Sequence, residues 1–116
     1  MSNNQKNYSI TNIGALSGLS DKKRVMFRDE LGLSGCEISA NSLAAGQSIP
    51  FVHTHKQNEE VYIILQGSGT FMVDDDEFTI QEGSFIKVAP AGKRVLAAGE
   101  TELIYLCIQT QQGSLK

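Results

Sequence analysis

The chain has 116 residues, of which 41% are hydrophobic and 20% charged, and its formal net charge is −3. These values are typical of one soluble globular domain, and the acidic balance argues against a nucleic-acid binder, which normally shows a basic face. No apolar run approaches the ~20 residues that a membrane span needs, and no export signal opens the chain, so we expect a cytoplasmic protein that binds neither membrane nor nucleic acid.

The chain divides into an arm and one domain. Residues 1–20 are polar and rich in Ser, Asn and Gly, which predicts an N-terminal arm with little regular structure. Residues 21–116 form the predicted β domain. Within it, residues 23–28 favour a strand, with a short helix as the alternative, and residues 29–35 contain two glycines that predict a turn.

Short strands dominate the rest of the sequence. Apolar and polar side chains alternate along residues 36–43, which predicts a strand with one exposed face. Seven further strands, separated by turns that contain Gly, Pro, Asp or polar residues, are expected at 48–55, 60–66, 70–74, 77–81, 84–88, 93–98 and 102–109. About eight or nine short strands without a long helix indicate an all-β fold, a small jelly-roll β-barrel.

One strand carries apolar side chains on both faces. The run from Val61 to Leu65 contains no polar residue other than Tyr62. A sheet with one face in water should alternate between apolar and polar residues. We therefore expect the outer face to be covered by the arm or by a second subunit, and we predict a homodimer.

Both histidines of the chain lie in one stretch, as His53-Thr54-His55. Side chains two residues apart on a strand project from one face. Four polar residues lead on to Glu60, and in the simplest hairpin register His55 lies opposite Glu60 and His53 opposite Tyr62. Opposed Cβ atoms are about 4.5–5.5 Å apart, so two imidazoles and one carboxylate would converge. This is a donor set for a divalent transition metal such as Fe, Mn, Ni, Co or Zn.

The same strand supplies neighbours for this site. Tyr62 and Ile64 share a face with Glu60, because side chains alternate along a strand. We expect both to line the mouth of the barrel around the metal.

This stretch resembles the first conserved motif of the cupin superfamily. That motif is Gly, five residues, His-any-His, three or four residues, Glu, six residues and Gly. The matching residues here are His53, His55, Glu60 and Gly67, and Gly46 stands six rather than five residues before the first histidine. The resemblance implies a cupin barrel that binds its metal through the two histidines and Glu60.

Residues 83–99 resemble the second cupin motif, which is Gly, five residues, Pro-any-Gly, two residues, His, three residues and Asn. Pro90 and Gly92 match, with one extra residue after Gly83, and the asparagine of the motif falls on Gly99. The family's fourth metal ligand, a histidine, falls on Val95, which would instead add an apolar wall. The chain has no third histidine. Whether the Cys107 sulfur replaces it stays open, because both faces of its strand are apolar.

The resemblance covers about residues 36–109 and implies two classes of function. The first is a metal-dependent enzyme acting on a small oxygenated metabolite, as a dioxygenase, decarboxylase or isomerase. The alternative is a non-catalytic module that binds a sugar or other small molecule and has a weak or vestigial metal site. Nothing in the chain selects between enzyme and binding module, and no catalytic residue is identified beyond the metal ligands.

Overall fold

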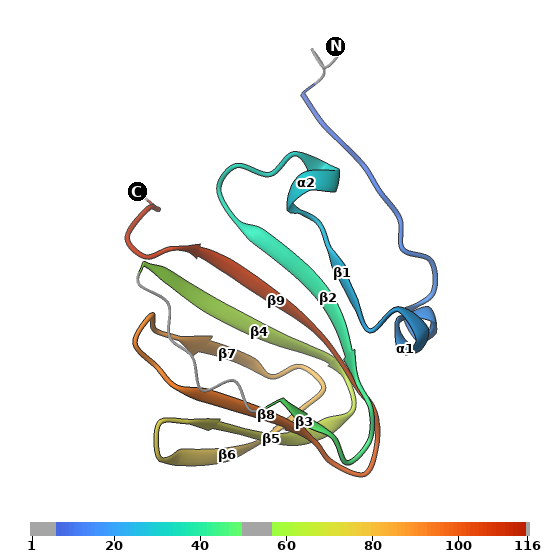
Figure 1. Cartoon of the computed structure of the whole chain (residues 1–116), viewed down its shortest axis with the longest axis vertical. Coiled ribbons are helices and arrows are strands. Elements are labelled where there is room, and N and C mark those ends of the chain that lie inside the picture. Colours follow the sequence, from blue (N-terminus) through green and yellow to red (C-terminus); the bar gives the residue numbers. More distant parts are fainter. Residues whose placement is uncertain (1–6, 50–56, 116) are drawn as a thin grey trace.

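The computed structural model describes residues 7–49 and 57–115 (Figure 1). His53 and His55, with most of the predicted strand 48–55, lie outside the described residues. The all-β prediction is confirmed, because antiparallel strands form nearly all the regular structure of the described part.

Two antiparallel sheets make up the fold (Figure 1). The five-stranded sheet contains, in spatial order, β1 (Arg24–Met26), β2 (Glu37–Leu43), β9 (Leu103–Gln111), β4 (Asn58–Gln66) and β7 (Phe85–Val88). The four-stranded sheet contains β3 (Ser48–Ile49), β8 (Arg94–Ala98), β5 (Ser68–Val73) and β6 (Asp76–Gln81).

The helices are single turns, found here as η1 (Leu16–Gly18), α1 (Leu19–Lys22) and α2 (Arg28–Leu31). The segment 23–28 begins as the strand β1, and α2 then occupies part of the predicted turn. Gly32 ends α2 in the left-handed conformation (φ 70°), and the Leu33 amide donates to the Arg28 carbonyl at 2.8 Å, which is the usual way a helix ends at glycine. None of the described helices has the length and apolar character needed to cross a membrane.

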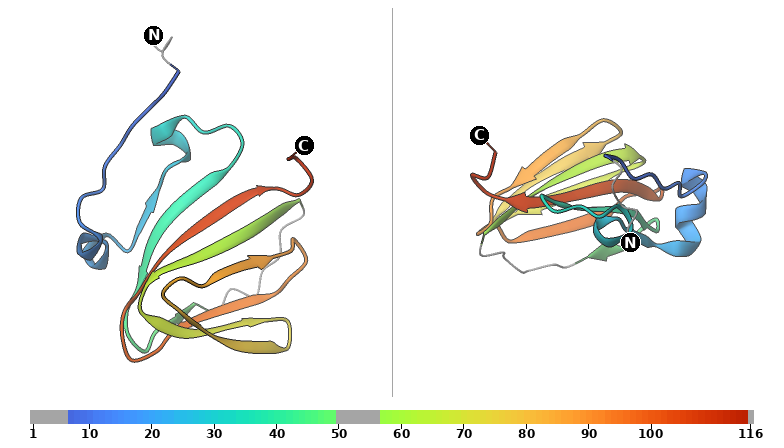
Figure 2. Two further views of the ribbon diagram at one scale, coloured as in Figure 1. Left: turned by 180° about the vertical axis from the view of Figure 1, so that it is seen from behind. Right: turned by 90° about the horizontal axis from the view of Figure 1, so that it is seen from above.

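Apolar side chains form two layers. The main core lies between the sheets and includes Ile64, Phe71 and Leu103. A second cluster joins Leu19 of α1 to Ala40 of β2 and to residues of β9, on the opposite face of the five-stranded sheet. Figure 2 shows the N-terminal segment and α1 beside β2, away from the four-stranded sheet. The arm is therefore anchored to the fold through α1.

The polar face of β2 points inward. Ser39 and Asn41 are 8% and 2% exposed, while Ala40 between them packs against α1. The expectation that the polar side of this strand faces solvent is wrong. The arm covers the apolar side of the strand, and the polar side chains line an internal cavity.

Strand β4 has a neighbour on each edge. Glu60 pairs with Val88 of β7 and with Gln109 of β9, and β3 pairs with β8 in the other sheet. The predicted hairpin register, which set the two histidines opposite Glu60 and Tyr62, is therefore wrong. A strand has only two edges, and other strands occupy both.

The outer face of β4 is half-buried at Val61, Ile63 and Leu65. Leu65 packs against the cluster that contains Leu19, so the arm covers one end of this face. For the rest of this face, cover by a second subunit in a homodimer stays a prediction.

Gly67, the last glycine of the first motif, has a structural role. Its φ is 91°, and a Cβ atom at this position would lie 2.1 Å from the Glu102 carbonyl oxygen. Only glycine permits both the left-handed backbone and this close approach.

Leu19 and Leu16 provide a matched test of how the arm is anchored. Leu19 is 1% exposed and Leu16 is 40% exposed, although both lie in the same helical segment. We predict that Leu19→Ala lowers the free energy of unfolding by about 2–5 kcal/mol, because it leaves a cavity. Leu16→Ala should cost less than about 1 kcal/mol. Urea unfolding measures both, and equal losses would contradict the assignment of Leu19 as the anchor.

Candidate functional site

A cavity of about 280 Å³ lies against the inner face of the five-stranded sheet. This is at the small end of ligand sites, which typically measure about 300–1,000 Å³. Most of its lining forms two rows across neighbouring strands, because directly paired residues share a face of a sheet. The rows are Met26, Ser39, Cys107 and Tyr62, and next to them Arg24, Asn41 and Tyr105. Gln109 and Glu60, also paired, complete the lining.

Glu60 and Arg94 form a buried ion pair between the two sheets. The Arg94 guanidinium donates through Nη1 to Glu60 Oε1, and both side chains are almost fully buried. The remaining guanidinium groups donate to the carbonyl of Gly92 at 2.7 and 3.2 Å and to that of Ala89 at 3.4 Å. Tyr62 donates its hydroxyl to the same Glu60 oxygen at 2.8 Å. Glu60 thus has charged and neutral donors on one oxygen.

Burial raises the pKa values of Tyr62 and Cys107, the two weakly acidic groups next to Glu60. It raises the pKa of the Tyr62 hydroxyl far above its ordinary value, with smaller contributions from Cys107 and Glu60. Burial, followed by the Glu60 charge, raises the pKa of the Cys107 thiol to about 12. At neutral pH both groups are uncharged and can serve as hydrogen-bond donors.

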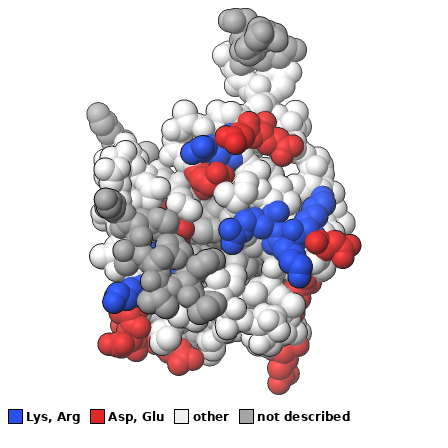
Figure 3. All heavy atoms as spheres, in the orientation of Figure 1, with Lys and Arg blue, Asp and Glu red and all other residues white. Residues whose placement is uncertain are grey.

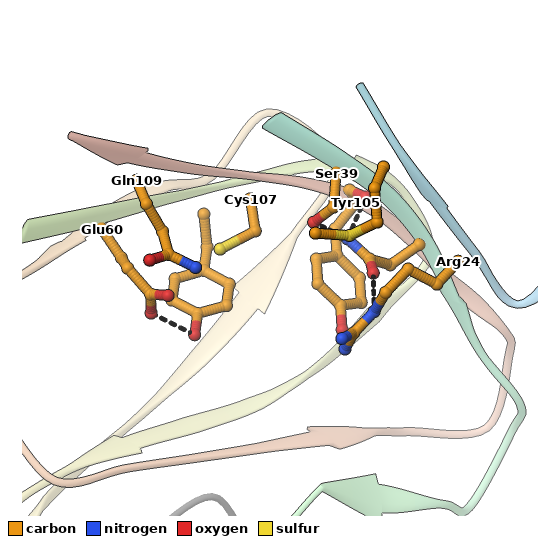
Figure 4. A pocket seen from close by; sticks show the side chains of 9 residues that line it. Arg24, Ser39, Glu60, Tyr105, Cys107 and Gln109 are labelled. Carbon is orange, nitrogen blue, oxygen red and sulfur yellow. Dashed lines mark hydrogen bonds between the residues drawn. The ribbon is translucent and has the colours of Figure 1, made fainter. Parts of the chain in front are cut away.

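A second polar group lies at Arg24. Its Nε–H donates to Asn41 Oδ1 at 3.0 Å, and the Asn41 amide donates to Ser39 Oγ at 2.9 Å. Tyr105 is buried beside it, and burial raises the pKa of its hydroxyl to about 12, with Arg24 acting in the opposite direction. Figure 4 shows Arg24 with Ser39 and Tyr105 at one end of the cavity and Glu60 with Gln109 at the other. The cavity therefore has two polar ends.

Of the three predicted pocket residues, Tyr62, Ile64 and Val95, one lines the cavity. Tyr62 lines the cavity, while Ile64 lies on the same face of β4 but deeper, in the core between the sheets. Cys107 faces the cavity, which answers the question that alternation along its strand left open. Val95 pairs with the partly exposed Met72 on the outer face of the four-stranded sheet, and it does not line the cavity.

Arg94 was not identified from the sequence. It lies one residue before Val95, and side chains alternate along β8, so Arg94, Leu96 and Ala98 face inward. The spacing of the second motif instead indicated the next residue, Val95, as the one at the site. The available signal was a lone arginine directly before the apolar run Val95–Ala98, but that pattern also describes a solvated strand end.

The described residues do not by themselves fit a divalent metal. Among them, no three His, Cys, Asp or Glu side chains come together as a metal site. Glu60 is the one predicted ligand inside the described ranges, and its carboxylate pairs with the Arg94 guanidinium. A fixed positive charge beside a ligand repels a dication and competes for the same carboxylate. His53 and His55 fall in the undescribed part of the chain.

Comparison with known proteins gives the family. The sequence profile of the cupin domain (Cupin_2) matches residues 42–109. The chain belongs to the cupin family. The likeness seen in its two motifs is thereby confirmed, and the match includes β4, β8 and most of β9, which carry Glu60, Arg94 and Cys107.

Solved structures and a curated relative agree with this assignment. A cupin protein from Bacteroides fragilis shares 41% sequence identity, superimposes with a TM-score of 0.85, and is matched over 96% of this chain and 90% of its own. A putative sugar phosphate isomerase from Acidithiobacillus ferrooxidans, at 24% identity and a TM-score of 0.68 over 76% of this cupin and 58% of its own chain, shares the fold. An uncharacterized protein from Methanocaldococcus jannaschii is 29% identical over 69 residues, which are 59% of this chain but only 55% of that relative.

The buried ion pair predicts an asymmetric response to substitution. Arg94→Met removes the guanidinium that pairs with the buried Glu60 carboxylate, and we expect a loss of about 3–5 kcal/mol in the free energy of unfolding. Replacing Glu60 and Arg94 together with Met should cost less than the sum of the single losses. Arg28 is the matched control, because its ion pair with Asp29 is exposed, and Arg28→Met should cost less than about 1 kcal/mol. Additive losses in a urea double-mutant cycle would show that the two charges are not coupled.

Proposed function

We propose that this cupin is a non-catalytic binding module that takes a small polar metabolite into the cavity beside β2, β9 and β4. The observation that carries the proposal is the row of buried polar side chains facing this cavity. A sheet face directed into a domain interior is normally apolar, and buried polar groups are costly unless they have partners. A polar ligand that hydrogen-bonds to these side chains would account for their place on an inward face.

The lining is preorganised for binding. Asn41 is held between Ser39 and Arg24, and Glu60 between Tyr62 and Arg94. Every buried side-chain nitrogen and oxygen in the described ranges has a hydrogen-bond partner. Fixed groups of this kind lose little conformational entropy when a ligand binds, which favours affinity for small molecules.

Two exposed methionines allow the cavity to be tested with little risk to folding. Met26 is 46% exposed and lines the cavity, whereas Met72 is 36% exposed on the other sheet and does not. We expect Met26→Trp to obstruct the cavity and to weaken binding at least about tenfold, equivalent to about 1.4 kcal/mol. Met72→Trp should bind like the wild type.

Saturation-transfer NMR and calorimetry make this measurement with a panel of sugars, polyols, hydroxycarboxylates and amino acids. At least one compound should bind the wild type and Met72→Trp but not Met26→Trp. Binding that survives in Met26→Trp would place the ligand elsewhere, and a panel without any ligand would count against a small-metabolite module.

A divalent metal held by His53, His55 and Glu60 is the second candidate. The motif spacing favours it, together with the position of Glu60 at one end of a cavity. Such an ion would polarise a small oxygenated ligand, as expected for a dioxygenase, decarboxylase or isomerase. Glu60 would then have to bind the ion in the presence of the Arg94 charge.

Substitution of either of two adjacent residues of β8 by histidine distinguishes the metal site from the metal-free binding module. Arg94→His removes the competing charge and directs a third imidazole toward Glu60, while Val95→His directs it to the opposite face of β8. If the histidines and Glu60 form a site, Arg94→His should bind Co²⁺ tightly and Val95→His should behave like the wild type. Wild-type protein purified without chelator should hold clearly substoichiometric metal by elemental analysis. One equivalent of metal that is lost in both His53→Ala and Glu60→Gln would establish a metal centre instead.

The homodimer and the cytoplasmic location are retained as proposals. The half-buried Ile63 pairs with Phe85, which is 70% exposed, and Val61 lies on the same face of β4. These apolar side chains support contact with a second copy of the chain.

A further inference from the structure

Arg24 is held in place by buried neighbours. Its Nε–H donates to Asn41 Oδ1 at 3.0 Å, and the Tyr105 hydroxyl lies beside its guanidinium (Figure 4). Asn41 and Tyr105 are 2% and 3% exposed, so the arginine at the rim is fixed by side chains that cannot move freely. A guanidinium has five N–H donors in a rigid fork. Donors therefore remain for a ligand after both contacts are made.

The charge of Arg24 has no acidic partner among the residues that the structure describes. Within residues 7–49 and 57–115, the ion pairs join Arg28 to Asp29 and Arg94 to Glu60, and neither involves Arg24. Asn41 is neutral, and Tyr105 is protonated at neutral pH. A fixed cation at a cavity, supported only by neutral groups, is an arrangement that binds an anion.

The charges at the cavity set the charge of that anion. Glu60 and Arg94 cancel each other, which leaves the single positive charge of Arg24 among the described groups. A monocarboxylate balances this charge. A phosphate monoester carries about −1.5 to −2 charges near neutral pH, so it would bring excess negative charge into the cavity that contains Glu60.

From this geometry we propose that Arg24 anchors the carboxylate of a small monocarboxylate whose polar substituents reach Gln109 and Glu60 at the other end of the cavity. This inference rests on the proposed binding function and names its ligand class. The two polar ends and the small volume suit a hydroxy acid, with a charge at one end and a hydroxyl at the other (Figure 4).

The surface next to Arg24 favours the approach of an anion. Lys22 and Lys23 directly precede it, and all three side chains are exposed. Figure 3 shows basic side chains gathered over the part of the molecule where α1 and β1 lie, although the chain as a whole is acidic. Local positive potential of this kind raises the rate at which anions reach a site, and salt weakens the effect.

Three probes with one carbon skeleton test the proposal. Glycerate is the monocarboxylate, glycerol is its neutral counterpart, and glycerol 3-phosphate is the more highly charged anion. Isothermal titration calorimetry should show saturable binding of glycerate to the wild type, weaker binding of glycerol 3-phosphate, and the weakest binding of glycerol. The glycerate affinity should also fall as the salt concentration rises.

Substitutions at Arg24 test its role. Arg24→Gln keeps a hydrogen-bonding side chain without the charge and should weaken glycerate binding at least about tenfold, with loss of its salt dependence. Arg24→Lys keeps the charge without the fork and should bind with intermediate affinity. The control is Arg28→Gln, whose side chain lies on α2 outside the cavity and which should bind glycerate like the wild type. Circular dichroism and thermal melts verify that each variant is folded.

The outcomes separate this inference from the function on which it rests. Equal glycerate affinity in the wild type and Arg24→Gln overturns the anchor, as does the absence of glycerate binding to the wild type. Tighter binding of glycerol 3-phosphate than of glycerate overturns the choice of a monocarboxylate. A neutral ligand that is sensitive to Met26→Trp but not to Arg24→Gln overturns the anchor while leaving the binding module intact.

Discussion

The buried pair of Glu60 and Arg94 is the constraint on which the site depends. Each charge alone would be costly to remove from water, and the pairing of the two side chains offsets part of that cost for both. The pair also connects the sheets, because Glu60 lies on β4 and Arg94 on β8. The carbonyls of Gly92 and Ala89 hold the guanidinium from the turn before β8. These contacts fix the position and the charge of Glu60 at one end of the cavity.

The cavity itself follows from the register of four strands. Pairing of β1 with β2, of β2 with β9 and of β9 with β4 places polar residues side by side on the inner face of the five-stranded sheet. The arm makes this possible, since Leu19 of α1 covers the apolar residues on the outer face of β2. Thus β2 turns Ala40 outward and its polar side chains Ser39 and Asn41 toward the interior. The contact of β2 with the arm and the polar lining of the cavity both follow from the orientation of this strand.

One departure from the cupin motifs bears directly on metal binding. The second motif of the family carries a metal-binding histidine, and the inward residue nearest that position here is Arg94. A guanidinium supplied by the chain is a permanent charge that cannot exchange, whereas a metal ion exchanges and keeps open positions for a ligand. Glu60 is present in both arrangements, but its partner differs. This difference is the physical reason why we favour binding over metal-dependent chemistry for this chain.

The sequence by itself determined the all-β class, the approximate strand boundaries and the family, because alternation and turn residues are local and His53, His55, Glu60 and Gly67 keep the spacing of the first motif. It also identified Glu60 and Tyr62 as residues of one face. Only the tertiary structure decided which strands are neighbours, and this corrected the hairpin register of β4 and the exposed face of β2. It also showed that Arg94 and not Val95 faces Glu60, and that Arg24 and Asn41 reach the same cavity. Strand pairing and the partner of a buried charge depend on residues far apart in the chain, which alternation along one strand cannot specify.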